Sequence, residues 1–225
     1  MLSYDGTAYA GWQSQPGPPT IQAVLTREAR RLCGEGARVT GASRTDAGVH
    51  ALRQTVSLTT TSALSPAAIL GALNAALPRD VRVREACDAA PTFHARYGAR
   101  GKRYLYLIDR GRVASPLLSR FVWHVPQPLD VGRMRAALAA LRGRHDFSAF
   151  RAAAGSRQNP VCTVRALHVL RRKDRLALLI SADRYLHHMV RTIVGSAVDV
   201  GRGARDPAWL AVAPSVQRPG RSIRR

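Results

Sequence analysis

The chain has 225 residues, 46% of them hydrophobic, which is enough to bury a substantial core in one large domain or two small ones. It carries 35 lysine and arginine residues against 14 aspartate and glutamate residues, a formal net charge of +21 that favours binding to a polyanion such as nucleic acid. Three scattered cysteines without Cys-x-x-Cys spacing argue against a zinc site and a disulfide framework, and without a leader-like start or a membrane-length apolar run we expect a cytoplasmic protein with no membrane partner.

The first half of the chain predicts strands and helices in alternation. Apolar residues recur every three or four positions in the expected helices and every second position in the expected strands. Thr20 and Ser65 stand where helix caps are expected, and Gly34 where the first helix should end. The predicted elements are a short strand before Asp5, a helix over Ile21–Leu32, a strand over Gln54–Thr59, a helix over Ala67–Leu77 and a strand around Val81 and Val83.

The second half repeats this scheme. Its predicted elements are a strand over Lys102–Asp109, a helix over Val131–Leu141, strands around Val164–Leu170 and Leu176–Ser181, a helix over Leu186–Val200 and a short helix after Asp206-Pro207. Two halves of similar order predict an α+β fold, with antiparallel sheets and helices on one face. We expect a boundary between residues 1–98 and 99–213, followed by a basic tail over 214–225 whose composition allows disorder.

The stretch Gly41–Ala51 concentrates residues capable of chemistry. If Arg44 and Asp46 leave a strand, their side chains point to the same face. At about 4 Å in a partly buried cleft, the attraction of roughly 4 kcal/mol would keep the carboxylate ionised and able to act as nucleophile or base. The alternative is an ordinary Asp-Ala-Gly turn with a surface ion pair, and residue types alone leave both interpretations open.

Two tyrosines and several cations form a second candidate site. Tyr104 and Tyr106 lie two apart in a predicted strand, with Arg96, Lys102 and Arg103 close in sequence. A ring flanked by cations suits an unstacked base held over phosphate contacts. Two aromatic residues packed in a core would give the same pattern, so both interpretations stay open.

A third candidate is the segment that contains His187, His188 and Arg191. These residues fall in the predicted helix, where spacings of three and four share a face. Paired histidines suggest a metal, but the two are adjacent and no carboxylate stands at the following i+4 position, so we expect no metal site. The other interpretation is a core helix whose His188 and Arg191 are merely solvated.

Seven short segments spread over residues 2 to 210 carry a family resemblance. They are Tyr4-Asp5-Gly6-Thr7, Gly11-Trp12-Gln13, Arg44-Thr45-Asp46-Ala47-Gly48-Val49-His50, Phe93-His94-Ala95-Arg96, Lys102-Arg103-Tyr104-Leu105-Tyr106, His145-Asp146-Phe147 and His187-His188-Met189-Val190-Arg191. In this order they resemble the TruA family of tRNA pseudouridine synthases, and the third looks like that family's active-site signature. Several separate matches are far more specific than any one of them.

The resemblance implies a fold and an activity. The fold would be two ferredoxin-like halves that form a continuous, mainly antiparallel sheet with helices on one face and a central RNA-binding cleft, usually in a homodimer. The activity would be isomerisation of uridine to pseudouridine in the anticodon stem-loop of tRNA, without cofactor or metal.

The resemblance also implies roles for individual residues. Asp46 would be the nucleophile and Tyr104 would pack against the target base. Arg191 would keep the carboxylate charged while Arg44 fills the space left by the flipped base, although the sequence leaves the roles of the two arginines interchangeable. The candidate substrate-binding residues are Arg96, Lys102, Arg103 and His188.

Other features favour structural roles or leave an alternative open. Asp5 could help to position the stretch around Asp46 or make only the Asp-Gly turn, and we favour the turn. We expect the His145-Asp146 pair to anchor a loop by hydrogen bonding. After Ala213 the sequence lacks the glycine-led apolar strand with which members of the family usually end. The alternative function is therefore a non-catalytic RNA-binding protein or RNA chaperone on the same fold.

Overall fold

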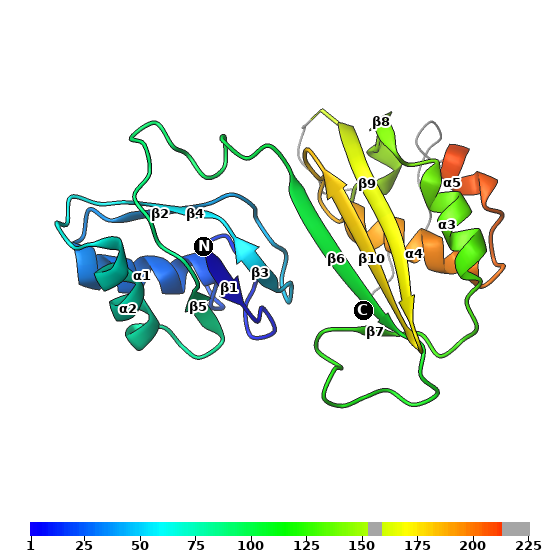
Figure 1. Ribbon diagram of the computed structural model, residues 1–225, viewed down its shortest axis with the longest axis horizontal. Coiled ribbons are helices and arrows are strands. Elements are labelled where there is room, and N and C mark those ends of the chain that lie inside the picture. Colours follow the sequence, from blue (N-terminus) through cyan, green and yellow to red (C-terminus); the bar gives the residue numbers. More distant parts are fainter. Residues whose placement is uncertain (153–158, 213–225) are drawn as a thin grey trace. The chain divides into compact units, whose positions relative to one another are not determined.

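The computed structural model of the protein describes residues 1–152 and 159–212, so the expected tail at 214–225 lies outside the described residues. The chain divides into two compact units, which we call unit 1 (Met1–Ala99) and unit 2 (from Arg100 onward). Each unit contains strands and helices (Figure 1), and the mixed α+β class predicted from the sequence is confirmed.

Unit 1 contains two separate antiparallel ladders. Strands β3 (Ala51–Gln54), β1 (Leu2–Tyr4) and β5 (Val81–Val83) form one, and β2 (Arg38–Gly41) pairs with β4 (Val56–Thr59) in the other. The predicted strand Gln54–Thr59 is therefore divided at Thr55, whose carbonyl accepts the Ala42 N–H. The chain changes partner there, because β3 pairs with β1 and β4 pairs with β2.

The two helices of unit 1 begin where local capping chemistry predicts. Helix α1 (Ile21–Cys33) starts after Thr20, whose side chain accepts the Ala23 N–H, and Gly34 follows it at φ 90°. Helix α2 (Pro66–Ala76) starts after Ser65, which caps Ala68 N–H. Both helices pack with β1 and β5 around a core that includes buried Trp12, Ile21, Leu25, Ala29 and Val81. The predicted helices are confirmed.

Unit 2 is built on a five-stranded sheet. Its strands are β7 (Trp123–His124), β6 (Lys102–Asp109), β10 (Arg175–Ala182), β9 (Val161–Arg172) and β8 (Gly143–Asp146), in that order across the sheet. All pairs are antiparallel except β6 with β7. Strand β6 has the predicted bounds, and β9 and β10 are longer than predicted. The two edge strands were not predicted, because β7 spans two residues and β8 is largely polar.

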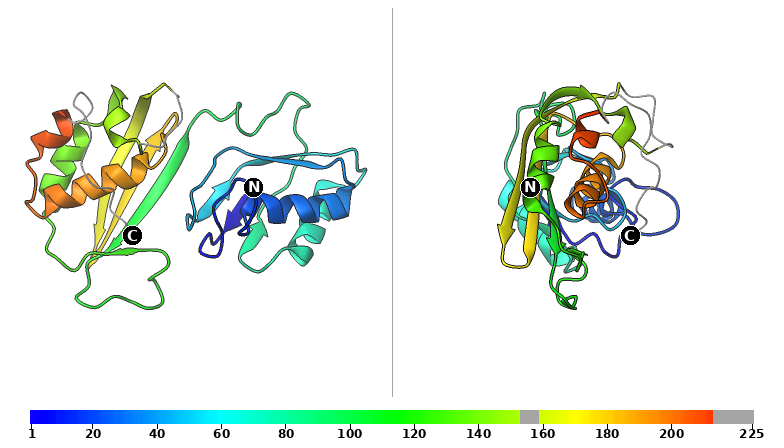
Figure 2. Two further views of the ribbon diagram at one scale, coloured as in Figure 1. Left: turned by 180° about the vertical axis from the view of Figure 1, so that it is seen from behind. Right: turned by 90° about the vertical axis from the view of Figure 1, so that its right-hand side faces the viewer.

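Helices cover one face of this sheet (Figures 1 and 2). They are α3 (Val131–Ala139), α4 (Met189–Gly201), α5 (Ala208–Val212) and the short 3-10 turn Ser148–Phe150. Helix α4 begins three residues later than predicted, because His188 adopts the left-handed conformation at φ 62°. The opposite face of the sheet leaves Leu105 and Leu170 about half exposed. Across residues 1–152 and 159–212, each helix is too short or too polar to cross a bilayer.

Candidate active site

Asp46 lies half-buried in the loop that joins β2 to β3, which we call the Asp46 loop (Ala42–His50). The loop is irregular from Ser43 to Asp46, so the strand alternation expected for Arg44 and Asp46 does not apply. The Arg44 side chain is exposed and, within the described residues, forms no ion pair. Of the two interpretations left open by the sequence, the Arg44–Asp46 ion pair is therefore not the one found in the described residues.

The residues before Asp46 are anchored to the core of unit 1. The Trp12 backbone N–H donates to the Thr45 carbonyl at 3.0 Å, and the Tyr4 hydroxyl lies 2.8 Å from Thr45 Oγ1. Gln54 Nε2 donates to the Ser43 carbonyl at 2.6 Å. Tyr4 and Trp12 are 4% and 1% exposed, so the loop rests on groups that cannot move without disturbing the core.

The residues after Asp46 are held from a second direction. His50 Nδ1 lies 3.1 Å from the Gly6 backbone nitrogen, which can donate to it, and 3.0 Å from Asp5 Oδ1. The Gly48 N–H donates to the Tyr9 carbonyl at 3.3 Å. Asp5 thus contacts the Asp46 loop as well as accepting the Thr7 N–H, and the expectation that it only makes a turn is wrong.

Two glycines allow the N-terminal segments of the chain to approach the Asp46 loop closely. A Cβ on Gly6 would lie 2.7 Å from the Val49 carbonyl carbon, and one on Gly11 would lie 2.5 Å from the Thr45 carbonyl oxygen. Gly11 also has a φ of +91°, which glycine adopts readily. The two N-terminal segments of the family pattern are therefore the supports of the Asp46 loop. This supporting role of the two segments was not predicted from the sequence.

In unit 2, Tyr104 and Tyr106 lie on the helix-covered face of the sheet. They pair with the buried residues Ile180 and Leu178 of β10, and Tyr106 packs against the core. The prediction that the two rings share a face is confirmed. Tyr106 is partly buried against the core, and this burial raises its pKa.

Tyr185 was missed by the sequence reasoning and packs directly on Tyr104. The two rings meet edge to face with centroids 4.7 Å apart. The Tyr185 hydroxyl donates to the Ile180 carbonyl at 2.7 Å, and burial, followed by the neighbouring Tyr104, raises its pKa. The available signal was its position two residues before the His187-His188 pair. Tyr185 fixes the orientation of the Tyr104 ring.

The two histidines precede α4, so the prediction that they lie on the helix is wrong. His188 is the N-cap residue in the left-handed conformation, a state that costs a non-glycine residue roughly 1–2 kcal/mol. Its ring lies 3.9 Å from that of His187 at 34°, and the His187 carbonyl accepts the Ala152 N–H. The two histidine rings therefore lie side by side immediately before the helix.

Arg191 is an exposed cation in the first turn of α4. Its charge lowers the pKa of Tyr106 and so opposes the effect of burial on that pKa. The guanidinium is therefore near the sheet face that carries Tyr104 and Tyr106, which we call the tyrosine face. A cation at a helix N-terminus is disfavoured by the helix dipole, by roughly 0.3–1 kcal/mol at an exposed position. A bound anion would reverse this cost, so the position suits interaction with a carboxylate or phosphate.

The remaining predicted substrate-binding residues belong to both units. Arg96, in unit 1, lies with its guanidinium carbon 6.0 Å from the centre of the Tyr97 ring. Lys102 is half-buried at the start of β6, while Arg103 is exposed on the sheet face opposite Tyr104. The expectation that Arg103 flanks the same base as Tyr104 is therefore wrong, because neighbouring residues of a strand point to opposite faces.

The His145-Asp146 pair has the structural role expected of it. His145 Nε2 hydrogen-bonds the Arg142 carbonyl at 2.8 Å, and Asp146 Oδ1 accepts the Ser148 N–H at 2.7 Å. These bonds fix the turns on either side of β8.

The sequence of the chain is similar to those of known proteins. A family model described as "tRNA pseudouridine synthase" matches residues 1–98 and 137–224. Proteins named tRNA pseudouridine synthase A are similar in Myxococcus xanthus (44% identical; 93% of this chain and 80% of the relative), Methylococcus capsulatus (45%; 93% and 77%) and Pelobacter propionicus (39%; 97% and 91%). The chain therefore belongs to the tRNA pseudouridine synthase family, a family of isomerases.

Proposed function

We propose that the protein isomerises uridine to pseudouridine in the anticodon stem-loop of tRNA, with Asp46 as nucleophile and without a cofactor. The observation that carries the proposal is the anchoring of the Asp46 loop by hydrogen bonds from Trp12 and Gln54 and by the contact with Tyr4. A nucleophile must be held close to its productive position before the substrate arrives, since a displacement of 1 Å can cost about 10²-fold in rate.

The reaction breaks the bond between C1′ of the ribose and N1 of uracil and forms a bond between C1′ and C5. The C5 proton is lost and N1 gains a proton, so the product has the composition of the substrate. The Asp46 carboxylate supplies the electron pair that starts the reaction, whether at the ribose or at the base. Tyr104 stacks on the flipped base, and stacking worth about 1–3 kcal/mol offsets part of the few kcal/mol that flipping costs.

We assign the two arginines different roles. Arg191 would keep the Asp46 carboxylate charged, which is supported by its position in the first turn of α4, where an anion is stabilising. Arg44 would occupy the space left by the flipped base, which is supported by its exposure and by its having no ion-pair partner within residues 1–152 and 159–212. A mobile cation suits that second role.

The RNA backbone would be held by Arg96, Lys102 and His188, in a cleft between two ferredoxin-like halves. The net charge of +21 supports strong electrostatic attraction to RNA. We further propose a cytoplasmic homodimer. Leu105 and Leu170, 49% and 58% exposed on the uncovered sheet face, support an interface that would bury them. Light scattering at micromolar concentration tests the dimer.

Release of tritium from tRNA labelled at C5 of uridine tests the activity. Wild-type protein should release tritium, and Asp46→Asn should reduce the rate by at least about 10³-fold, the scale on which loss of a nucleophile acts. The matched control is Glu35→Gln, which removes one acid from an exposed position and should act like wild type. Folded wild-type protein that binds tRNA but releases no tritium would leave the non-catalytic RNA-binding alternative.

A further inference from the structure

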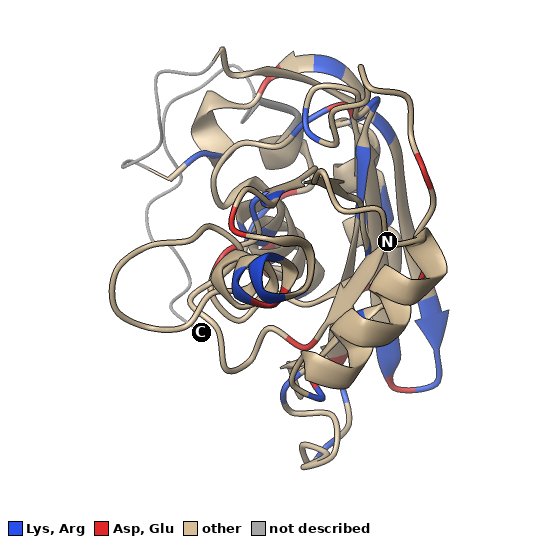
Figure 3. Ribbon diagram, turned by 90° about the vertical axis from the view of Figure 1, so that its left-hand side faces the viewer, with Lys and Arg blue, Asp and Glu red and all other residues tan. Residues whose placement is uncertain are grey.

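The turn between β9 and β10 presents an unneutralised group of cations, which we call the basic tip: Arg171, Arg172, Lys173 and Arg175. All four side chains are exposed, and none forms an ion pair with any other described residue. Figure 3 shows the positive charge gathered at this turn, interrupted by one acid. Four like charges within five residues repel one another in the free protein, so an anionic partner would stabilise the tip.

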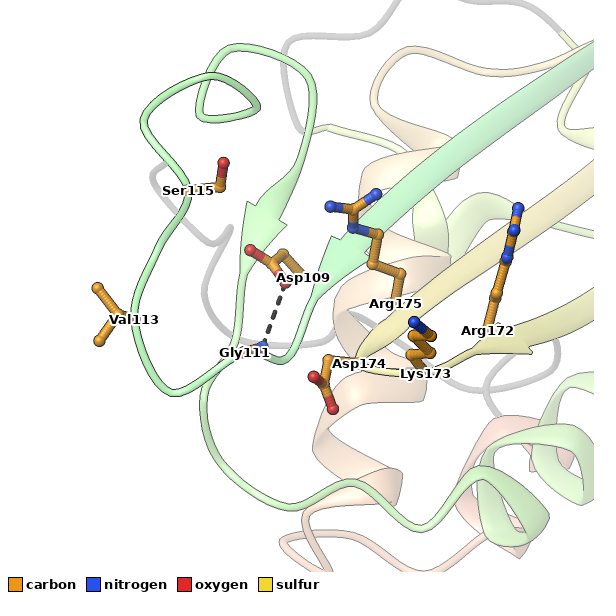
Figure 4. A pocket seen from close by; sticks show the side chains of 8 residues that line it. All are labelled: Asp109, Gly111, Val113, Ser115, Arg172, Lys173, Asp174 and Arg175. Atoms are coloured by element: carbon orange, nitrogen blue, oxygen red, sulfur yellow. Dashed lines mark hydrogen bonds between the residues drawn. The ribbon is translucent and has the colours of Figure 1, made fainter.

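The basic tip borders a pocket of about 520 Å³ in unit 2 (Figure 4). Its other wall is the loop that follows β6. The pocket is lined by Asp109, Gly111, Val113, Ser115, Arg172, Lys173, Asp174 and Arg175. Figure 4 shows Arg172 and Arg175 on the same side of the hairpin, as expected for residues paired across it, and Asp174 pointing away from them.

Backbone hydrogen bonds hold the two walls together. The Arg110 N–H donates to the Asp174 carbonyl at 2.7 Å, and the Val125 N–H donates to the Asp109 carbonyl at 2.8 Å. Asp109, only 6% exposed, accepts the Gly111 N–H through Oδ1 at 3.2 Å. The concave shape is therefore a property of the folded unit rather than of side-chain positions alone.

We propose that the basic tip and its pocket bind the sugar–phosphate backbone of the RNA substrate at a nucleotide distant from the reacting uridine. Three cations and two carboxylates line the pocket, so a free phosphate ion would gain little there. An RNA backbone suits this mixture better, because its phosphates pair with the tip cations while a ribose hydroxyl can donate to the exposed carboxylate of Asp174. This inference rests on the proposed RNA substrate.

The position of the tip separates it from the chemistry. Asp109 and Tyr104 lie five residues apart on the same strand, which corresponds to about 17 Å. A nucleotide stacked on Tyr104 therefore cannot also contact the tip. The tip acts on affinity for RNA and leaves the rate of the chemical step unchanged.

The test compares two triple variants that remove the same charge. Arg172→Gln/Lys173→Gln/Arg175→Gln removes three tip cations, and Arg30→Gln/Arg38→Gln/Arg79→Gln removes three exposed arginines from unit 1. We expect the tip variant to weaken tRNA binding on the order of 10-fold at 0.15 M salt and to reduce the slope of log K against log salt by about 2–3. The control should change the slope by less than about 1.

Each outcome decides the inference. Equal weakening by the two variants would mean that only overall charge matters, and unchanged binding by the tip variant would mean that the tip does not contact RNA. A slower single-turnover rate at saturating tRNA would place the tip in the chemistry, which also overturns the inference. Wild-type protein without turnover would refute the proposed function, while the binding comparison would still decide the role of the tip.

Discussion

The Asp46 loop of unit 1 and the tyrosine face of unit 2 hold their side chains by different means. The loop has no regular structure and depends on contacts with residues 41 and 44 positions away in the chain, at Tyr4 and Gly6. Tyr104 instead extends from a continuous eight-residue strand and is oriented by an edge-to-face contact with Tyr185. The position of the carboxylate therefore depends on backbone packing, whereas that of the stacking ring depends on ordinary strand pairing and side-chain contacts.

The largest effect is expected from a methyl group added at Gly6, where the N-terminal segment contacts the Asp46 loop. Gly6→Ala would place a Cβ 2.7 Å from the Val49 carbonyl carbon, so the loop must shift. We expect tritium release to fall by at least about 10²-fold, since a 1 Å displacement of a catalytic group has that effect. Circular dichroism should still show a folded protein.

The control for this substitution is Gly71→Ala on the exposed side of α2, where nothing lies within 4 Å of the added carbon. It should leave activity unchanged and raise the free energy of unfolding by up to about 1 kcal/mol. Full activity of Gly6→Ala would show that the loop does not need its close contact with Val49.

The two tyrosines of β6 provide a smaller test within unit 2. Tyr104→Leu removes the proposed stacking surface, and we expect kcat/KM to fall roughly 5- to 150-fold, corresponding to about 1–3 kcal/mol. Tyr106→Leu disturbs the core and should lower the free energy of unfolding by about 1–3 kcal/mol, with less effect on turnover. Kinetics and urea denaturation of both variants give the answer. A larger kinetic defect in folded Tyr106→Leu than in Tyr104→Leu would reverse the assigned roles.

The smallest test concerns two partly buried hydroxyl groups, one in each unit. Burial is the main cause that raises the pKa of Tyr9, whose hydroxyl donates to Asp80 Oδ1 at 2.8 Å, and the pKa of Tyr185. The folded protein keeps these protons while the unfolded chain loses them near pH 10, so the resulting stability is present below about pH 10 and declines at higher pH.

Phenylalanine cannot ionise, so Tyr9→Phe and Tyr185→Phe should each lack the part of this decline in stability that comes from the replaced tyrosine. Each variant lacks one hydrogen bond and should be about 1 kcal/mol less stable than wild type at pH 8. The difference in free energy of unfolding between wild type and each variant should be smaller at pH 11 than at pH 8, as measured by urea denaturation at both pH values. Tyr97→Phe, at a side chain that is 80% exposed, is the matched control and should follow wild type. A difference that widens at pH 11 would contradict the expected sign.

The helices and the central strands of unit 2 were predictable because their causes are local. Thr20 and Ser65 cap helices through residues three positions away, and β6 shows its alternation within eight residues. The late start of α4 was not predictable in this way. It depends on the left-handed backbone of His188, which nothing in the periodicity of apolar residues reveals.

By itself, the sequence determined the α+β class, the family and the identity of Asp46 as the candidate nucleophile, because capping, alternation and motif order are all written along the chain. Only the tertiary structure decided that Arg44 does not pair with Asp46, that Tyr185 supports Tyr104 and that Gly6 and Gly11 carry the Asp46 loop. The physical reason is that these contacts join residues far apart in sequence, and a contact of that kind leaves no periodic pattern in either partner.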